Sequence, residues 1–303
     1  MNKSLDELGS LSFIYMNEGV DKMFNKLSRR QQVIYLTESG LIPYSERLRL
    51  LQDPDRERVK IPAKHYNKWQ DFTAHYPPAY FQDLYQKEGV VPLVLGDAAY
   101  PEGLVETHKP ALVLFCQGDL TLLKRLALAV VGSRKMTAYG QEALESFLPE
   151  VAKKLVIVSG LANGIDCVSH QIAMEEQGKT IAVIGTGLGQ VYPDNHAKLQ
   201  SQIARDHLLV SALPYHAGAK RWHFPYRNEI IAGLSAACLV VEAGHKSGSL
   251  ITANYALQAN RDVFAVPGPI NQPLSRGTNE LIQAGAKLIL TSQDILEEYS
   301  HLF

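Results

Sequence analysis

Residues 126–134 have the sequence LALAVVGSR, an unbroken apolar run that ends in glycine, serine and arginine. A short run that is apolar at every position is typical of a strand buried on both faces, as in a parallel sheet. Residues 137–154 follow with the length and spacing of a helix. The stretch therefore predicts the strand, turn and helix with which an α/β domain is built.

The same pattern recurs along the chain after about Gly89. The apolar runs are residues 111–116, 126–131, 155–158, 180–184, 208–210, 238–241, 263–266 and 288–290. Helical stretches such as residues 165–177 separate them. This alternation predicts a doubly wound, extended Rossmann-like domain with a mostly parallel sheet, which we assign to residues 89–303.

Residues 1–88 have a different pattern. They are charged and helical in character, are broken at Gly40 and Pro43, and show no sustained alternation of period two. We therefore expect a small all-α domain of short helices before the α/β domain. The pattern assigns this domain no partner.

Charge and composition limit the classes of function. The chain has 303 residues, of which 46% are hydrophobic and 20% charged, with a formal net charge of −1. This is ordinary globular composition, and the whole-molecule field will not attract nucleic acid as a strongly basic domain does. A phosphate-bearing ligand would have to be held by a local group of cations.

No sequence signal points to a membrane, a metal or a disulfide. No apolar run is long enough to cross a bilayer, and residues 1–10 lack a basic segment followed by an apolar stretch, so we expect a cytosolic protein. Cys116, Cys167 and Cys238 stand alone, without the spacing of a zinc site. We expect neither a metal nor a cofactor.

Small residues follow the expected strands at their carboxyl ends, in residues 132–134, 159–164, 185–189, 242–249 and 267–268. In an open parallel sheet these ends meet at one edge, where ligands bind. Glycine lets the backbone approach a ligand, and exposed N–H groups favour an anion. In any one turn, the glycine could be needed only to let the chain turn tightly between strand and helix. Five such turns at one edge predict a phosphate-binding crevice. The candidate residues are Gly132, Ser133, Gly160, Gly164, Gly187, Ser247, Gly248 and Ser249.

Cations and aromatic residues supply the second set of candidates. Arg134 adds a charge to the first glycine turn, and residues 220–228 have the sequence KRWHFPYRN. Bases stack on aromatic rings while cations follow the phosphates, which is the pattern of a single-stranded nucleic-acid groove. The candidates are Arg134, Arg221, Trp222, Phe224, Arg227 and Asn228. Alternatively, Arg134 pairs with a carboxylate and the aromatic rings anchor a loop.

The motifs of common Rossmann enzymes are missing. No GxGxxG follows the first strand, and no Walker loop ends in Gly-Lys-Ser or Gly-Lys-Thr. Asp166 and His170 are four residues apart on one helix face, but no nucleophile accompanies them. We interpret Asp166 as a helix-start carboxylate and His170 as structural, and we assign no catalytic residue.

With these residues in hand, the α/β region resembles the DNA-processing protein A (DprA or Smf) family. The matching blocks are VGSR at 131–134, SGLA at 159–162, GID at 164–166, TIAV at 180–183, YP at 192–193, FP at 224–225, RN at 227–228, VEA at 241–243, SGSLIT at 247–252, VPG at 266–268 and GTN at 277–279. Their number and order make the resemblance specific.

The resemblance implies a non-catalytic protein that binds and protects single-stranded DNA, forms a homodimer and helps to load the RecA recombinase during natural transformation. It implies that residues 132–134 and Arg221 contact DNA and that Phe224, Arg227 and Asn228 line the same pocket. It also likens residues 1–88 to a sterile-alpha-motif domain.

Three positions depart from the family pattern. Glu229 stands where the family usually has arginine, Ala212 where it usually has glutamate, and Asn163 where it often has a cation. Glu229 should weaken phosphate binding if its side chain faces the ligand.

Two other functions remain open at this point. One is a nucleotide-hydrolysing enzyme of the phosphoribohydrolase type, whose glycine-rich signature is partly echoed by Pro267, Gly268 and residues 277–280, with Glu280 one position early. The other is a nucleotide-sensing regulator that uses the same crevice without chemistry.

Overall fold

The computed structural model describes residues 13–15, 23–53 and 59–302. The chain divides into two compact units, Met1–Glu88 and Gly89–Phe303. In the part of the chain described, no helix combines the length and the apolar character needed to cross a membrane.

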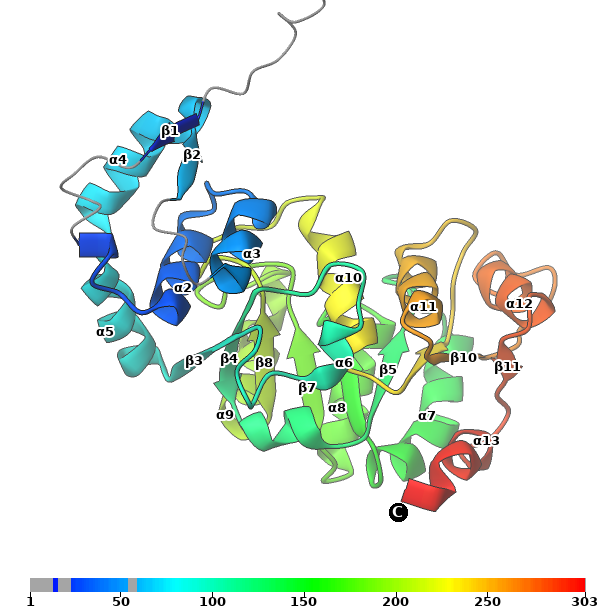
Figure 1. Cartoon of the computed structure of the whole chain (residues 1–303). Coiled ribbons are helices and arrows are strands. Elements are labelled where there is room, and N and C mark those ends of the chain that lie inside the picture. The colour runs from blue at the N-terminus through cyan, green and yellow to red at the C-terminus, as the bar shows by residue number, and fades with distance from the viewer. Residues whose placement is uncertain (1–12, 16–22, 54–58, 303) are drawn as a thin grey trace, which may run out of the picture. The chain divides into compact units, whose positions relative to one another are not determined.

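The first unit contains helices and a short antiparallel ribbon (Figure 1). The helices are α2 (Arg29–Ser39), α3 (Tyr44–Gln52), α4 (Tyr66–His75) and α5 (Pro78–Glu88), and the strands are β1 (Phe13–Tyr15) and β2 (Lys60–Pro62). The helices agree with the expectation of an all-α region, but the ribbon does not. Strands of three residues are too short to leave an alternating pattern in the sequence.

Local signals and an aromatic core explain this unit. A capping box between Ser28 and Gln31 begins α2, and Gly40 ends it with a φ of 62°. In the core, the Tyr35 ring lies 5.2 Å from Phe72 and 6.0 Å from the buried Trp69. The Tyr35 hydroxyl donates to the carbonyl of Tyr76, which satisfies its polar end.

A nine-stranded sheet forms the centre of the second unit, in the order β11-β10-β9-β5-β6-β7-β8-β4-β3 (Figure 1). The strands are β3 (Val90–Val94), β4 (Val113–Gly118), β5 (Ala127–Val131), β6 (Val156–Ser159), β7 (Thr180–Val183), β8 (Leu208–Ser211), β9 (Ala237–Val240), β10 (Asp262–Ala265) and β11 (Lys287–Leu288). The strands from β11 to β8 are parallel, whereas β4 runs antiparallel to β8 and to β3.

The predicted doubly wound, mostly parallel sheet is therefore confirmed. Each apolar run found in the sequence lies on a strand, within a residue or two at its ends. The additional strand is β3 at the edge of the sheet, which contains Pro92. Proline is tolerated at sheet edges, although it weakens the strand signal in the sequence.

Helices cover both faces of the sheet (Figure 1). They are α6 (Glu102–Val105), α7 (Ala138–Ala152), α8 (Ile165–Glu175), α9 (Ala197–Asp206), α10 (His223–Gly233), α11 (Gly248–Gln258), α12 (Arg276–Gln283) and α13 (Gln293–Leu296). Along β5, Ala129 and Val131 pack in one core with residues of α10 and α11, and Leu128 and Val130 pack in another with residues of α7 and α8. This alternation explains why the strand is apolar at every position.

The direction of winding changes between β5 and β9. The chain proceeds from β5 through β6 and β7 to β8, then returns to form β9 on the other side of β5. The loops that leave β5 and β9 therefore diverge to opposite faces. Such a switch point leaves a crevice at the carboxyl ends of the strands, where ligands of open α/β proteins bind.

His170 of α8 lies entirely in the core, as expected of a structural residue. Its Nδ1 is 2.6 Å from the Thr180 hydroxyl, which itself donates to the carbonyl of Ile157. The Thr180 hydroxyl uses its one proton in that bond, so His170 must donate from Nδ1 to the hydroxyl oxygen. Burial, followed by the nearby charges of His207 and Arg227, lowers the pKa of His170 to about 3.

We expect acid to destabilise the protein partly through His170. Its pKa is about 6.5 in an unfolded chain, so the unfolded state takes up the proton first. The stabilising contribution is complete above about pH 6.5 and is lost as the pH falls toward 3, by up to about 1.4 kcal/mol per pH unit. His170→Gln keeps a donor for Thr180 but cannot titrate. The free energy of urea unfolding should fall less between about pH 7.5 and about pH 5 in this variant than in wild type.

His108→Gln, at an exposed histidine, serves as the control and should retain the wild-type difference. If both variants show the same pH dependence as wild type, His170 is not a source of the acid sensitivity.

Candidate nucleic-acid interface

A crevice of about 750 Å³ opens at the switch point of the sheet. It is lined by residues from the loops after β5, β6, β7, β9 and β10 and from the first turns of α8, α10 and α11, together with Arg221 just before α10. They are Val131, Gly132, Ser133, Arg134, Lys135, Ala162, Asp166, Tyr192, Arg221, Phe224, Pro225, Arg227, Asn228, Gly244, Ser247, Gly248, Ser249, Ile251, Thr252 and Leu274.

Close packing fixes the turn after β5. A Cβ on Gly132 would lie 2.5 Å from Cγ1 of Ile165, so only glycine allows α8 to approach. Gly164 has a φ of 76°, which favours glycine, and a Cβ there would lie 2.3 Å from the carbonyl oxygen of Ser133. The Ile165 N–H donates to that oxygen. The turn is thereby fastened to the first residue of α8.

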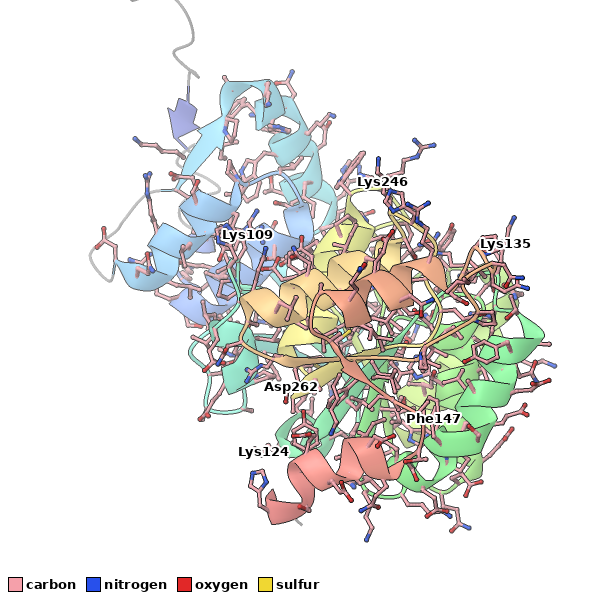
Figure 2. All side chains as sticks on the ribbon, turned by 90° about the vertical axis from the view of Figure 1, so that its right-hand side faces the viewer. Lys109, Lys124, Lys135, Phe147, Lys246 and Asp262 are labelled. Carbon is pink, nitrogen blue, oxygen red and sulfur yellow. The ribbon has the colours of Figure 1, made fainter. Side chains whose placement is uncertain are left out.

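Arg134 is an exposed cation at the mouth of the crevice. Its guanidinium lies 5.2 Å from the centroid of the Phe224 ring, within range of a cation–π interaction. Among the described residues no carboxylate pairs with it, which removes the alternative of a structural ion pair. Figure 2 shows Lys135, the next residue, and Lys246 at one end of the unit and Lys124 at the opposite end.

Arg227 is buried beneath the crevice and is already paired. Its Nη1 lies 3.5 Å from Oδ2 of Asp166, and both side chains are more than nine-tenths buried. Burial raises the pKa of the Asp166 carboxyl, against the lowering effect of Arg227. Burial likewise lowers the pKa of Arg227, against the raising effect of Asp166. Arg227 therefore acts as a support for the floor, not as the free cation that the sequence suggested.

The lining is cationic even without Arg227. Arg134, Lys135 and Arg221 are exposed and have no carboxylate partner among the described residues. Asp166 is the single carboxylate of the described lining, and Arg227 offsets its charge. Three uncompensated positive charges therefore surround the opening, in a chain whose net charge is −1.

Backbone and hydroxyl groups complete the lining on the side of α11. The Ser247 hydroxyl accepts from the N–H of Ser249 and so caps the helix. The two serine hydroxyls lie 2.8 Å apart. Asn228 donates to the carbonyl of Gly248, which ties α10 to this turn. The N-terminus of an eleven-residue helix thus faces the crevice with its positive dipole end.

Four of the residues chosen from the sequence do not line the crevice. Gly160 lies under Arg227, since a Cβ there would be 1.2 Å from its Nη1. Gly164 supports the β5 turn as described above. Gly187 packs against the backbone of Pro214 and Tyr215. Trp222 is 70% exposed and lies outside the lining, with Lys220 5.6 Å from its ring centroid.

The structure adds lining residues that the site prediction lacked. They include Lys135, Tyr192, Ile251, Thr252 and Leu274. Lys135 directly follows the predicted arginine and could have been included on that ground. Tyr192 lies three residues after the glycine turn of residues 185–189 and within the matching block at 192–193, so the sequence offered a signal for it. Leu274 is neither charged nor next to a glycine, and no local signal marks it.

The departures from the family pattern do not reach the crevice. Glu229 is buried, and its Oε1 accepts from the backbone N–H of Lys109 at 2.9 Å. Asn163 is exposed and accepts from the amide of Asn195. Ala212 is buried after β8. The expected loss of phosphate binding therefore does not follow from Glu229.

The residues that echo a phosphoribohydrolase have structural partners instead. Glu280 lies outside the crevice, where it pairs with Arg276 at 2.9 Å and with His245 at 3.3 Å. Asn279 exchanges two hydrogen bonds with the backbone of Gly268. Residues 277–280 therefore contribute no carboxylate to the crevice.

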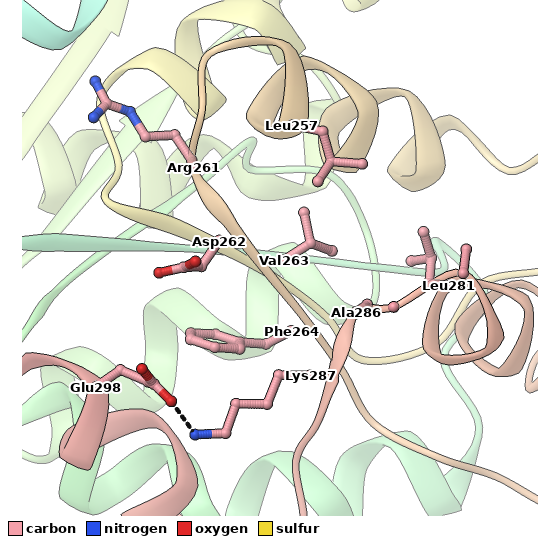
Figure 3. A pocket seen from close by; sticks show the side chains of 11 residues that line it. Leu257, Arg261, Asp262, Val263, Phe264, Leu281, Ala286, Lys287 and Glu298 are labelled. Carbon is pink, nitrogen blue, oxygen red and sulfur yellow. Dashed lines mark hydrogen bonds and ion pairs between the residues drawn. The ribbon is translucent and has the colours of Figure 1, made fainter.

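A second cavity, of about 280 Å³, lies at the edge of the sheet near β10 and β11. Figure 3 shows Leu257, Val263 and Leu281 around it and an ion pair between Lys287 and Glu298 at one side. This lining offers few free charges. In the described part of the chain, no group of three or more His, Cys, Asp or Glu residues could hold a metal ion.

An open, doubly wound sheet with a cationic crevice at its switch point defines a Rossmann-like protein. Residues 92–300 match the family of DNA recombination-mediator protein A. The chain belongs to this family.

Relatives of known name support the assignment. DNA processing protein DprA of Bacillus subtilis is 40% identical over 251 residues, which are 82% of this chain and 84% of that protein. DprA of Streptococcus pneumoniae is 47% identical over 203 residues, 67% of this chain and 72% of that protein.

Two solved structures share the fold. The X-ray structure of DprA from Streptococcus pneumoniae has a TM-score of 0.74 at 38% identity. The match covers 89% of this chain and 97% of the chain in that structure. DNA processing protein A from Helicobacter pylori, described with its single-stranded DNA binding mode, has a TM-score of 0.63 at 29% identity. The match covers 71% of this chain and 97% of the chain in that structure.

The buried ion pair predicts a large loss of stability in Asp166→Ala. The change leaves the Arg227 charge buried without a partner, which costs about 3–5 kcal/mol in the free energy of unfolding. Urea unfolding followed by circular dichroism measures it. Glu175→Ala removes an exposed carboxylate from the same helix and should change stability by less than about 0.5 kcal/mol. Equal midpoints for the two variants would show that the pair does not support the crevice floor.

Proposed function

We propose that this protein binds single-stranded DNA in the crevice and acts as a recombination mediator. The observation that carries the proposal is the set of three unpaired cations, Arg134, Lys135 and Arg221, around a crevice that also contains aromatic rings. Cations neutralise the phosphates, and rings offer stacking surfaces that only unpaired bases can use. The single-stranded DNA binding mode described for the Helicobacter pylori relative supports the same ligand.

We propose further that the protein works without catalysis. The carboxylate of the crevice, Asp166, is buried against Arg227 and is not placed to act as a base on a ligand. Glu280, the carboxylate of the hydrolase alternative, is committed to Arg276 and His245. Purified protein incubated with a panel of nucleotides should accordingly release no free base.

The partners of the proposed function are RecA and a second copy of the chain. The family description as a recombination mediator supports a recombinase as the recipient of the bound strand. In this proposal the protein acts in the cytosol, protects incoming DNA during natural transformation and helps RecA to assemble on it.

Arg134→Ala and Arg221→Ala should each weaken binding of a labelled single-stranded oligonucleotide by about ten- to hundredfold, because each removes a charge-assisted contact to phosphate. Each should also reduce the slope of log affinity against log salt by about one unit. Fluorescence anisotropy over a salt series measures both quantities.

Arg125→Ala is the matched control, because Arg125 is exposed and lies two residues before β5, at the end of the strand opposite to Arg134. It should bind as wild type does. Wild-type affinity in all three variants would place the DNA elsewhere, and absence of binding by wild type would reject the proposed function.

The mediator role predicts a second effect of the same variants. Wild-type protein should accelerate RecA-driven strand exchange on single strands already coated with single-strand-binding protein, and Arg134→Ala should lose this effect because it no longer holds the strand. Arg125→Ala should behave as wild type. Acceleration that survives in Arg134→Ala would separate any action on RecA from DNA binding in the crevice.

A further inference from the structure

The crevice contains two aromatic rings that differ in how much of their surface is free. Phe224 is half-buried, with Arg134 5.2 Å above its ring, and it packs so closely on Gly185 that a Cβ there would lie 2.9 Å from Cδ1. Tyr192 lines the same crevice and is 44% exposed. The Phe224 surface is therefore largely occupied, whereas the Tyr192 surface is open.

Tyr192 is held in place through Phe224. The two ring centroids lie 5.6 Å apart at an interplanar angle of 46°, within the range of a favourable aromatic pair. In the described part of the chain the Tyr192 hydroxyl has no hydrogen-bond partner. Contact with Phe224 supports one part of the ring, and the remainder faces the crevice.

The position of Tyr192 relative to the cations suits a nucleotide. Arg134 and Tyr192 both contact the Phe224 ring, so a free cation and an exposed ring lie next to the same residue. A phosphate at Arg134 therefore brings an adjacent base within reach of Tyr192. Trp222, the most exposed aromatic residue of the cationic segment, lies outside the lining.

We propose that Tyr192 is the ring on which a nucleobase of the bound strand stacks, while Phe224 holds Arg134 and Tyr192 in position. The inference rests on the proposed single-stranded DNA binding. It assigns to Tyr192 a contact with the base, whereas Arg134 and Arg221 contact the backbone.

The test compares two oligonucleotides of equal length and charge, oligothymidylate and a fully abasic strand. Tyr192→Leu should weaken binding to oligothymidylate by about five- to a hundredfold, the range for loss of one stacked base. It should leave binding to the abasic strand unchanged. Tyr192→Phe keeps the ring and should bind both strands as wild type does. The salt dependence should be unaltered in both variants, because no charge is removed.

The control is Tyr139→Leu, which removes a ring that is 40% exposed but outside the crevice. It should not affect either strand. Equal loss on both strands in Tyr192→Leu would show a merely structural role, and no loss on either would show that the base lies elsewhere. If wild type binds neither strand, the proposed function itself fails.

A second measurement does not depend on a variant. Oligonucleotides carrying 5-iodouracil form photo-crosslinks to aromatic rings that stack on the base, and peptide mass spectrometry locates them. We expect the crosslink at Tyr192. A crosslink at Phe224 or Trp222 instead would overturn the assignment.

Discussion

The parallel sheet must be covered on both faces, and the rest of the second unit follows from this constraint. Parallel neighbours cannot be joined by tight turns, so helices connect them and bury alternate residues on each face. Along β5, alternate residues pack in two separate cores. Covering both faces also requires the winding to reverse once, at β5 and β9. The crevice lies at that reversal because no helix can cover the point from which two loops diverge.

The buried pair of Asp166 and Arg227 links this architecture to the site. Asp166 also accepts from the N–H of Gly160, so the loop after β6, the start of α8 and the first turns of α10 meet at one carboxylate. An isolated buried charge would be costly, and the two groups offset each other. The pair supports the floor while contributing no net charge. The exposed cations above it, Arg134 and Arg221, remain available to a ligand.

Much of the fold could be predicted because strands buried on both faces leave unbroken apolar runs. Strand β3, which contains Pro92, and the three-residue ribbon left no such pattern. In the site, Arg134 was predictable because it lies in the glycine turn that follows β5. The partner of Arg227 was not, since Asp166 and Arg227 are 61 residues apart in the sequence and meet only where the start of α8 and α10 come together at the carboxyl ends of the strands. Tyr192 was not among the predicted site residues, because it is neither charged nor a glycine, and it enters the crevice only through the fold of its loop.

Helix geometry explains why the most adverse sequence difference leaves the crevice cationic. Successive residues of an α-helix are rotated by about 100°, so Glu229 lies about 200° around α10 from Arg227. Arg227 points to the crevice floor, and Glu229 therefore points away, where it accepts from the backbone N–H of Lys109. Its charge satisfies a backbone donor on the far side of the helix. Glu229 thus lies on the other side of α10 from the crevice floor, and Arg134, Lys135 and Arg221 remain the exposed cations of the lining.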